Sequence, residues 1–373
     1  MRLSANRKKE PSWSSLGYRA RRIKPMTTLQ HGGRLYQAAR QFGRPPAAWL
    51  DLSTAIHPQG WRPRQPIPDA CWGRLPEDED DLHAAAQGYY GTPHLVPVAG
   101  SQAAIQALPR LRAPARVGVV APTYGEHALA WQGAGHGVQS LAAEQVESAL
   151  AALDVLVVVN PNNPTGERFA VTQLQRWLHR LAGRGGWLVV DEAFMDATPQ
   201  QSMLPQVGQP GLVVLRSLGK FFGLAGLRVG FCMGEQALLE AMQGLLGPWT
   251  LAHMARWAAS QALQDRAWQA QTRAELPQQS DQLGQRLAQY GLPVWGGTAL
   301  FQYVRHEQAQ PIWRQFAQRG ILLRHFEQPQ ALRVGLPGDA AQWQRFQTVL
   351  QEVMQEQARF RPGCAEGGAG AVG

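Results

Sequence analysis

Three short apolar runs in the middle of the chain are each followed at once by polar residues. The runs cover residues 156–159, 187–190 and 212–215, and the polar residues that follow them include Asn163, Asp191 and Lys220. A short, continuous apolar run is typical of a strand buried on both faces of a parallel sheet. Open α/β sheets bind ligands at the edge where their strands end, so we expect Asn163, Asp191 and Lys220 to lie at one edge.

The pattern divides the rest of the chain into a larger and a smaller part. Strand and helix signals alternate from about residue 95 to 235, as in an α/β domain. Helical periods follow in 251–290, and short strands are indicated at 294–304 and 332–336. The length of 373 residues, 45% of them hydrophobic, is enough for one large core with a second, smaller domain.

Lys220 lies among small and apolar residues between 216 and 230. Desolvation disfavours the charged form of such a lysine and makes it a better nucleophile, so Lys220 is a candidate for a Schiff base with an aldehyde cofactor. Ser217 and Arg228 supply a hydroxyl and a guanidinium that could both reach a phosphate beside it. The alternative is a solvated lysine and arginine in a glycine-rich loop.

Four motifs in order carry a resemblance to a known family. They are NPNNPTG at 160–166, DEAF at 191–194, SLGK at 217–220 and GLRVG at 226–230. The chain resembles the fold-type I enzymes that depend on pyridoxal 5'-phosphate (PLP), in the aminotransferase superfamily, from residue 31 to about 350. The resemblance implies an α/β fold, with a mostly parallel central sheet flanked by helices in the large domain and a smaller α+β domain.

We expect the large, PLP-binding domain at 51–249 and the small domain at 28–50 and 250–358. Residues 1–27 and 359–373 are expected to be a disordered basic extension and a disordered tail. Relatives build the active site between two subunits, so the resemblance also implies a homodimer.

The resemblance gives roles to several of these residues. Ionised Asp191 would pair with the pyridinium nitrogen of PLP, so that the ring accepts electrons, and Asn163 would donate to the ring 3'-oxygen. Asn163 could instead, or in addition, cap the turn before Pro164. Arg333, in a short strand near the C-terminus, matches the arginine that binds the substrate carboxylate; a solvated edge-strand arginine is the alternative.

Two further segments are predicted to contact the cofactor. Gly100, Ser101 and Gln102 precede good helix formers and would offer a phosphate the donors of a helix N-terminus; Ser101 could also be an ordinary N-cap. The segment 121–127 matches the one that supplies the ring-stacking aromatic in relatives. By that match the stacking residue is His127, with Tyr124 second, and a structural role is the alternative for His127.

Two positions depart from the pattern of many aminotransferases. Phe194 stands where they have a tyrosine whose hydroxyl donates to the 3'-oxygen. Leu75 stands where they have a tyrosine that reaches the phosphate of the neighbouring subunit. Neither side chain here can make that hydrogen bond.

The N-terminal part narrows the substrate. His31, Gly32 and Gly33 come before the segment 49–58, and the two together resemble the opening of the L-threonine-O-3-phosphate decarboxylases of cobalamin biosynthesis. This branch is close to histidinol-phosphate aminotransferases. Glycines there would expose backbone N–H groups to a substrate phosphate, and Arg324 is a further candidate for that phosphate. Ala55 departs from the branch, in which an asparagine is common. A surface role for His31 is the alternative.

The implied reaction is decarboxylation of L-threonine O-3-phosphate to 1-amino-2-propanol O-phosphate. An aminotransferase of the histidinol-phosphate type is the alternative, because the same motifs hold the cofactor whether the carboxylate or the hydrogen at the α-carbon is removed. A PLP-binding transcription regulator would need a DNA-binding domain, for which the 30 residues before His31 are too few.

Charge and cysteine content limit the partners. The net charge of +9 could suggest nucleic acid, but eight basic residues lie within 1–25, so we expect a small phosphorylated amino acid and no nucleic acid. No run of 18 apolar residues indicates a membrane span, and no metal is predicted. Cys71, Cys232 and Cys364 show no metal-site or pairing pattern, which suits the cytoplasm.

Overall fold

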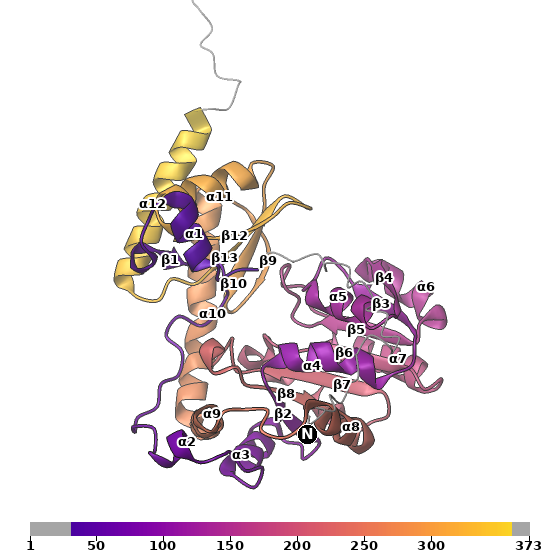
Figure 1. Ribbon diagram of the computed structural model, residues 1–373. Coiled ribbons are helices and arrows are strands. Elements are labelled where there is room, and N and C mark those ends of the chain that lie inside the picture. The colour runs from indigo at the N-terminus through magenta and orange to yellow at the C-terminus, as the bar shows by residue number, and fades with distance from the viewer. Residues whose placement is uncertain (1–30, 360–373) are drawn as a thin grey trace, which may run out of the picture. The chain divides into compact units, whose positions relative to one another are not determined.

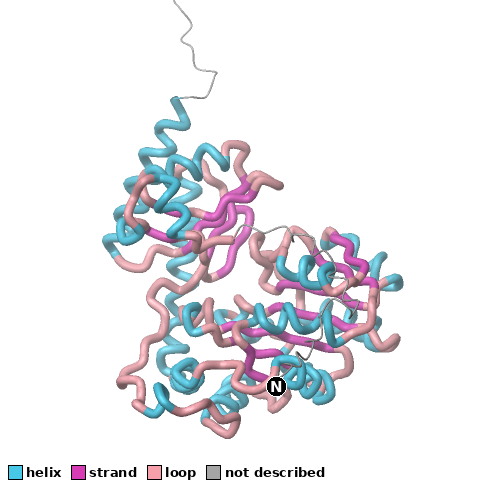
Figure 2. The backbone as a smooth tube through the Cα atoms, in the orientation of Figure 1, coloured by secondary structure: helices cyan, strands magenta, loops and turns pink. Residues whose placement is uncertain are grey.

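A seven-stranded sheet forms the core of the larger part of the protein. The computed structural model describes residues 31–359, so the extension expected at 1–27 and nearly all of the expected tail lie outside the described residues. The strand order is β2-β8-β7-β6-β5-β3-β4, and only the pairings that β8 makes, with β2 and β7, are antiparallel (Figures 1 and 2). The strands are β2 Leu95–Val98, β3 Arg116–Val120, β4 Gly137–Leu141, β5 Val155–Val159, β6 Trp187–Asp191, β7 Leu212–Ser217 and β8 Gly230–Met233.

Both faces of this sheet are covered, which explains its unbroken apolar runs. In β5, Val155 and Val157 belong to a buried cluster with residues of three helices, α4 Ser101–Ala107, α5 Glu126–Gly133 and α8 Gln236–Leu246. Leu156 and Val158 belong to a second cluster on the opposite face. That cluster includes residues of α3 Asp81–Tyr90, α7 Val171–Ala182 and α9 His253–Gln264; the short helices α2 Ala70–Gly73 and α6 Val146–Ala149 complete this part. Alternate side chains thus enter two separate cores.

The three predicted central strands are adjacent and parallel. β5 pairs with β6 and β6 pairs with β7, with Val159 opposite Asp191 and Asp191 opposite Leu215. Their carboxyl ends therefore meet at one edge of the sheet, as the sequence predicts.

A four-stranded antiparallel sheet, in the order β12-β13-β10-β9, forms the smaller part. Its strands are β9 Val294–Thr298, β10 Phe301–Arg305, β12 Arg324–Phe326 and β13 Ala331–Gly335. Helices α11 Ala309–Gln318 and α12 Ala340–Arg359 belong to this part, and α1 Leu35–Phe42 packs with α11 through Ala38, Ala39 and Ala317. Strand β1, Leu50–Asp51, pairs in parallel with β11, Ile321–Leu322. The N-terminal segment thus packs with the small part.

The long helix α10, Arg266–Gln289, leads from the large part to the small sheet (Figure 1). Its Ser280 donates to the carbonyl oxygen of Thr298 in β9, at 2.7 Å. The preceding helix α9 packs against α3 and α2. Residues 253–264, which we assigned to the small domain, therefore lie against the large one. Arg359, assigned to the tail, is the last residue of α12.

Within residues 31–359, no helix is both long enough and apolar enough to cross a membrane.

Candidate active site

A cavity of about 140 Å³ lies at the edge where β5, β6 and β7 end. Eight of the residues singled out from the sequence line it, together with Phe194. These eight are Ser101, Gln102, Tyr124, Asn163, Asp191, Ser217, Lys220 and Arg228. They come from segments more than 120 residues apart, and the parallel strands bring them together.

Lys220 follows β7, and its amine lies against a backbone carbonyl group. Its Nζ donates to the carbonyl oxygen of Thr54, at 3.2 Å. Burial, with a further contribution from the positive charge of Arg333, lowers the pKa of Lys220 from 10.5 to about 7, although Asp191 opposes this. Near neutral pH a large fraction of the amine is therefore uncharged, as a nucleophile requires.

The segment 54–61 supports the Lys220 loop, a contact that sequence reasoning missed. The backbone N–H of His57 donates to the carbonyl of Lys220, at 3.0 Å, and the N–H of Trp61 donates to that of Phe222, at 2.9 Å. Gly60 and Gly223 meet backbone to backbone, because a Cβ on Gly60 would lie 2.5 Å from the Cα of Gly223. The two glycines were the only sequence signal of this contact.

Asp191 is held by a histidine rather than by solvent. Its Oδ2 lies 2.9 Å from Nε2 of His127, and its Oδ1 accepts from the backbone N–H of Ala193, at 3.0 Å. His127 is 1% exposed, and it is not among the residues that line the cavity, whereas Tyr124 is. Our assignment of the stacking residue to His127, with Tyr124 second, stays a prediction. Tyr124 lies on the wall of the cavity, and His127 contacts Asp191.

Gly100, which does not line the cavity, lies beside three residues that do, Ser101, Ser217 and Arg228. Gly100, with a φ of 71°, is the N-cap of α4, and Ser101 is the first helical residue rather than the cap. A Cβ on Gly100 would lie 2.5 Å from Nη2 of Arg228, so glycine lets the guanidinium approach the helix start. Arg228 itself has a φ of 55°, and Ser217 lies with it on the cavity wall. Hydroxyl, guanidinium and backbone donors together suit a phosphate.

Arg333 is buried and joins the small sheet to the large one. Its Nη2 donates to the carbonyl oxygen of Ser53, at 2.6 Å, and its Nη1 donates to Oδ1 of Asn163. Its Nε has no hydrogen-bond partner among the described residues. Burial and the charge of Arg324 lower the pKa of Arg333 to about 9, against the effect of Asp51.

The two predicted substrate arginines come from one row of the small sheet. Arg324 lies opposite Arg333, which lies opposite Tyr303, which lies opposite Gly296. Residues directly opposite each other share a face of a sheet. Arg324 therefore emerges on the same face as Arg333, and its guanidinium lies 4.8 Å from the Phe326 ring centroid.

His31, Gly32 and Gly33 do not line the cavity but are tied to its surroundings. His31 Nε2 lies 2.7 Å from Oε1 of Glu126, whose Oε2 accepts from Gln102 Nε2, at 2.9 Å. Gly33 N–H donates to Ser53 Oγ, at 2.8 Å, and a Cβ on Gly32 would overlap the Ser53 carbonyl. Glu126 was missed because a lone glutamate carries no distinguishing sequence signal.

The residues that depart from the family pattern are also placed. Phe194 lies beneath Lys220, with Nζ 5.3 Å from the ring centroid, and packs edge-on against Phe301. An apolar ring therefore stands where many aminotransferases have the tyrosine with its hydroxyl. Ala55 has a left-handed φ of 53°, a conformation that asparagine adopts more readily. Leu75 is 64% exposed.

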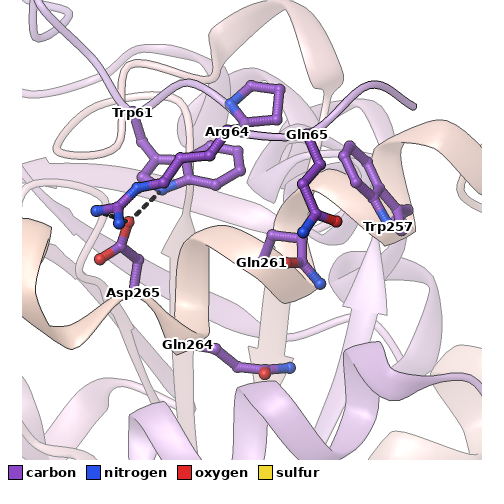
Figure 3. A pocket seen from close by; sticks show the side chains of 8 residues that line it. Trp61, Arg64, Gln65, Trp257, Gln261, Gln264 and Asp265 are labelled. Atoms are coloured by element: carbon purple, nitrogen blue, oxygen red, sulfur yellow. Dashed lines mark hydrogen bonds and ion pairs between the residues drawn. The ribbon is translucent and has the colours of Figure 1, made fainter. Parts of the chain in front are cut away.

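A separate surface cavity of about 250 Å³ lies beside the start of α10 (Figure 3). Trp61 and Trp257 line it with three glutamines, and Asp265 accepts from the indole of Trp61, at 3.1 Å. No residue singled out from the sequence lines it. Within residues 31–359, no group of three or more His, Cys, Asp or Glu side chains is arranged to hold a metal.

The fold and the site indicate an enzyme of the aminotransferase superfamily, and comparisons with known proteins agree. Residues 78–350 match the family model for aminotransferase class I and II, and the chain belongs to this family. The structure resembles histidinol-phosphate aminotransferase from Sinorhizobium meliloti in complex with pyridoxal-5'-phosphate, with a TM-score of 0.77 at 22% identity over 90% of this chain and 98% of that one. At this identity the likeness establishes the fold alone.

Two relatives with higher identity point within the family. The chain is 53% identical to the threonine-phosphate decarboxylase of Pseudomonas aeruginosa, over 86% of this chain and 97% of the relative. It is 40% identical to the threonine-phosphate decarboxylase of a Sinorhizobium species, again over 86% and 97%.

Proposed function

We propose that this protein is a PLP-dependent carboxy-lyase that converts L-threonine O-3-phosphate to (R)-1-amino-2-propanol O-phosphate and CO2. The observation that carries the proposal is the 53% identity to a threonine-phosphate decarboxylase along 97% of that enzyme. The product would supply the aminopropanol arm of cobalamin.

The side chains that line the cavity are of the chemical types that PLP requires. Lys220, with its pKa lowered to about 7, is the attachment point for the aldehyde. Asp191, which contacts His127, would pair with the pyridine nitrogen, and His127, with Tyr124 second, would stack on the ring. When bound, PLP supplies a protonated ring that accepts the electron pair of a bond broken at the substrate α-carbon.

The phosphate and the 3'-oxygen of PLP have separate partners. Ser101, Gln102, Ser217 and Arg228, with Gly100 making room for the guanidinium, suit the phosphate. Asn163 also lines the cavity and would donate to the 3'-oxygen through its amide nitrogen, because its Oδ1 already accepts from Arg333. The phosphate and the 3'-oxygen would thus be bound by different residues.

The substrate would be held through its carboxylate and its phosphate. Arg333 would bind the carboxylate; in support, its Nη1 contacts Asn163 and its Nε has no partner among the described residues. Arg324 on the same face, and His31 with the backbone of Gly32 and Gly33, are assigned to the phosphate. Lys220, released when the substrate amine takes its place, is positioned to carry a proton to the α-carbon after CO2 has left.

We infer a homodimer as the working form. Trp72, Leu75 and Trp249 are 68%, 64% and 61% exposed, which is unusual for such large apolar side chains. They belong to neighbouring segments, because Nδ1 of His253, four residues after Trp249, lies 3.3 Å from the carbonyl oxygen of Arg74. A second copy of the chain would cover this surface.

The decisive experiment follows CO2 release from L-threonine O-3-phosphate by PLP-loaded protein, without any keto acid. Release is expected from the wild type and is expected to disappear in Lys220→Ala. The matched control is Lys220→Arg, which keeps the positive charge but cannot form the covalent attachment. If no CO2 is released, and amino transfer appears only when histidinol phosphate and 2-oxoglutarate are supplied, the protein is an aminotransferase instead.

A further inference from the structure

The small sheet touches the turn at 160–166 at a second place besides Arg333. Gly296 and Gly297 of β9 lie against Thr165 and Gly166. A Cβ on Gly296 would overlap the carbonyl oxygen of Thr165, and a Cβ on Gly166 would overlap the backbone of Gly297. Two backbones therefore meet here with no room for a side chain between them.

Gly296 lies in the same row of the small sheet as Arg333, the arginine proposed to bind the substrate carboxylate. Gly296 lies opposite Tyr303, and Tyr303 lies opposite Arg333. Because opposite residues share a face, a Cβ on Gly296 would point to the side from which Arg333 reaches Asn163. The contact of Arg333 with Asn163 and the contact of Gly296 with Thr165 are both made to the turn at 160–166. A displacement of the sheet at Gly296 would therefore move Arg333 relative to Asn163.

Gly296 is the cleanest probe among the glycines at this contact. A Cβ on Gly297 would lie 2.5 Å from the carbonyl oxygen of Phe301 and 2.6 Å from Oε1 of Gln302, both within its own sheet. Gly166 has a φ of 75°, so a side chain there is also strained by the backbone. At Gly296 the neighbours within 4 Å of an added Cβ are the carbonyl atoms of Thr165 alone.

We propose that Gly296 is a positioning residue, whose missing side chain sets the distance between the small sheet and the turn at 160–166 and so fixes Arg333 on the substrate carboxylate. A methyl group at this position lifts the sheet from Thr165. Arg333 then reaches the carboxylate less well, whereas Lys220 and the segment from His31 to Gly33, which lie outside this sheet, are displaced less. The inference deepens the proposed function and rests on it for the identity of the substrate.

The test compares two ligands that differ in the carboxylate. L-threonine O-3-phosphate carries it, and 1-amino-2-propanol O-phosphate lacks it. Binding of each to PLP-loaded protein is followed by the change in cofactor absorbance in the first moments after mixing, before the first ligand is turned over. In Gly296→Ala, the dissociation constant of the first is expected to rise about tenfold, since misplacement by about 1 Å can cost up to a hundredfold. That of the second is expected to rise less, since it makes no contact with Arg333 and loses only the part of its phosphate binding that Arg324, in the same sheet, supplies.

Two further variants test whether the change in affinity arises at the contact between Gly296 and Thr165. Gly244→Ala, on the outside of α8 with nothing within 4 Å of the added methyl group, is expected to change neither constant. Arg333→Gln is expected to weaken the carboxylate ligand as well, and Gly296→Ala is expected to add little in that background, because both changes act on one contact.

Equal weakening of the two ligands, or no weakening of either, would overturn the proposal. If Gly296→Ala does not fold, Gly166→Ala brings a methyl group to the same contact from the other side, and the same selective loss is required of it. The proposed function is judged separately, by CO2 release from the wild type. If the wild type binds both ligands but releases no CO2, the proposed reaction is refuted. The comparison of the two ligands still tests the role of Gly296.

Discussion

At the scale of single residues, the amine of Lys220 is the group whose protonation state decides reactivity. Its pKa of about 7 lies below the ordinary value of 10.5, mainly because of burial and then because of Arg333. The protonated amine cannot attack an aldehyde, so the rate of PLP uptake by cofactor-free protein should rise with pH and level off above about pH 7. The measurement is the growth of cofactor absorbance after mixing at a series of pH values.

Arg333→Gln is the control for this profile. Removing the positive charge of Arg333 stabilises the protonated amine, so the midpoint should move to higher pH. A wild-type midpoint near 10 would contradict the depressed pKa.

The roles of His127 and Tyr124 can be separated by substitution. His127→Phe keeps an aromatic ring but loses the hydrogen bond to Asp191, a bond to a charged group worth about 1.5–3 kcal/mol. We expect its PLP dissociation constant to rise about tenfold to a hundredfold. Tyr124→Phe keeps the ring and loses only the hydrogen bond to Gln102, so its affinity should stay close to that of the wild type. The reverse ranking would contradict the role of His127 in holding Asp191.

The sequence located the chemistry of the site better than its geometry. Lys220, Asp191 and Asn163 could be placed because each follows a buried apolar strand, and parallel strands end at one edge. His127 and Tyr124 are three residues apart on one turn, and the sequence pattern does not say which of the two contacts Asp191. The carbonyl groups of Ser53 and Thr54 could not be predicted, because every residue carries one.

At the scale of elements, a buried charge cluster fixes the segment after β6. Arg216 donates to Asp196, at 2.9 Å, and lies 3.2 Å from Glu192; all three are at most 1% exposed. Tyr89 of α3 donates to the same Asp196, at 3.1 Å. The cluster thus ties β7, α3 and the turn beyond Asp191 together.

Asp196→Asn should therefore be strongly destabilising. Removing one partner of a buried ion pair leaves the other uncompensated, at a cost of about 3–5 kcal/mol. The matched substitution is Asp154→Asn in the partly exposed pair of Asp154 with Arg116, which should cost less than about 1 kcal/mol. Urea unfolding of both variants measures the difference, and equal costs would count against the cluster.

Element boundaries show where sequence patterns are least informative. The pattern of 251–290 indicates helix correctly, but it does not reveal that α9 packs on α3 while α10 continues to the small sheet. Both helices have apolar faces, and the identity of the partner surface is a long-range property. The cap of α4 is similar, since Gly100 and Ser101 are both common at that position.

At the scale of the whole molecule, the exposed apolar surface around Leu75 and Trp249 bears on assembly. Replacing Leu75 with Asp would place a charge in the inferred interface, so a shift from dimer to monomer is expected in sedimentation. Trp295→Ala is the control, because Trp295 is 64% exposed on β9, in the small sheet. A wild-type monomer, or a dimer that both variants preserve, would contradict the inferred interface.

The pairing of β1 with β11 has a consequence for synthesis on the ribosome. Leu50 and Asp51 are translated early, but their partners Ile321 and Leu322 follow about 270 residues later. At roughly 5–20 residues per second, this first strand waits about 15 to 50 seconds for its partner. The seven-stranded sheet, complete at Met233, can form during that interval. Nascent chains would thus pass through a stage in which the edge proposed to bind the cofactor already exists, while Arg333, proposed to bind the substrate carboxylate, has not yet been made.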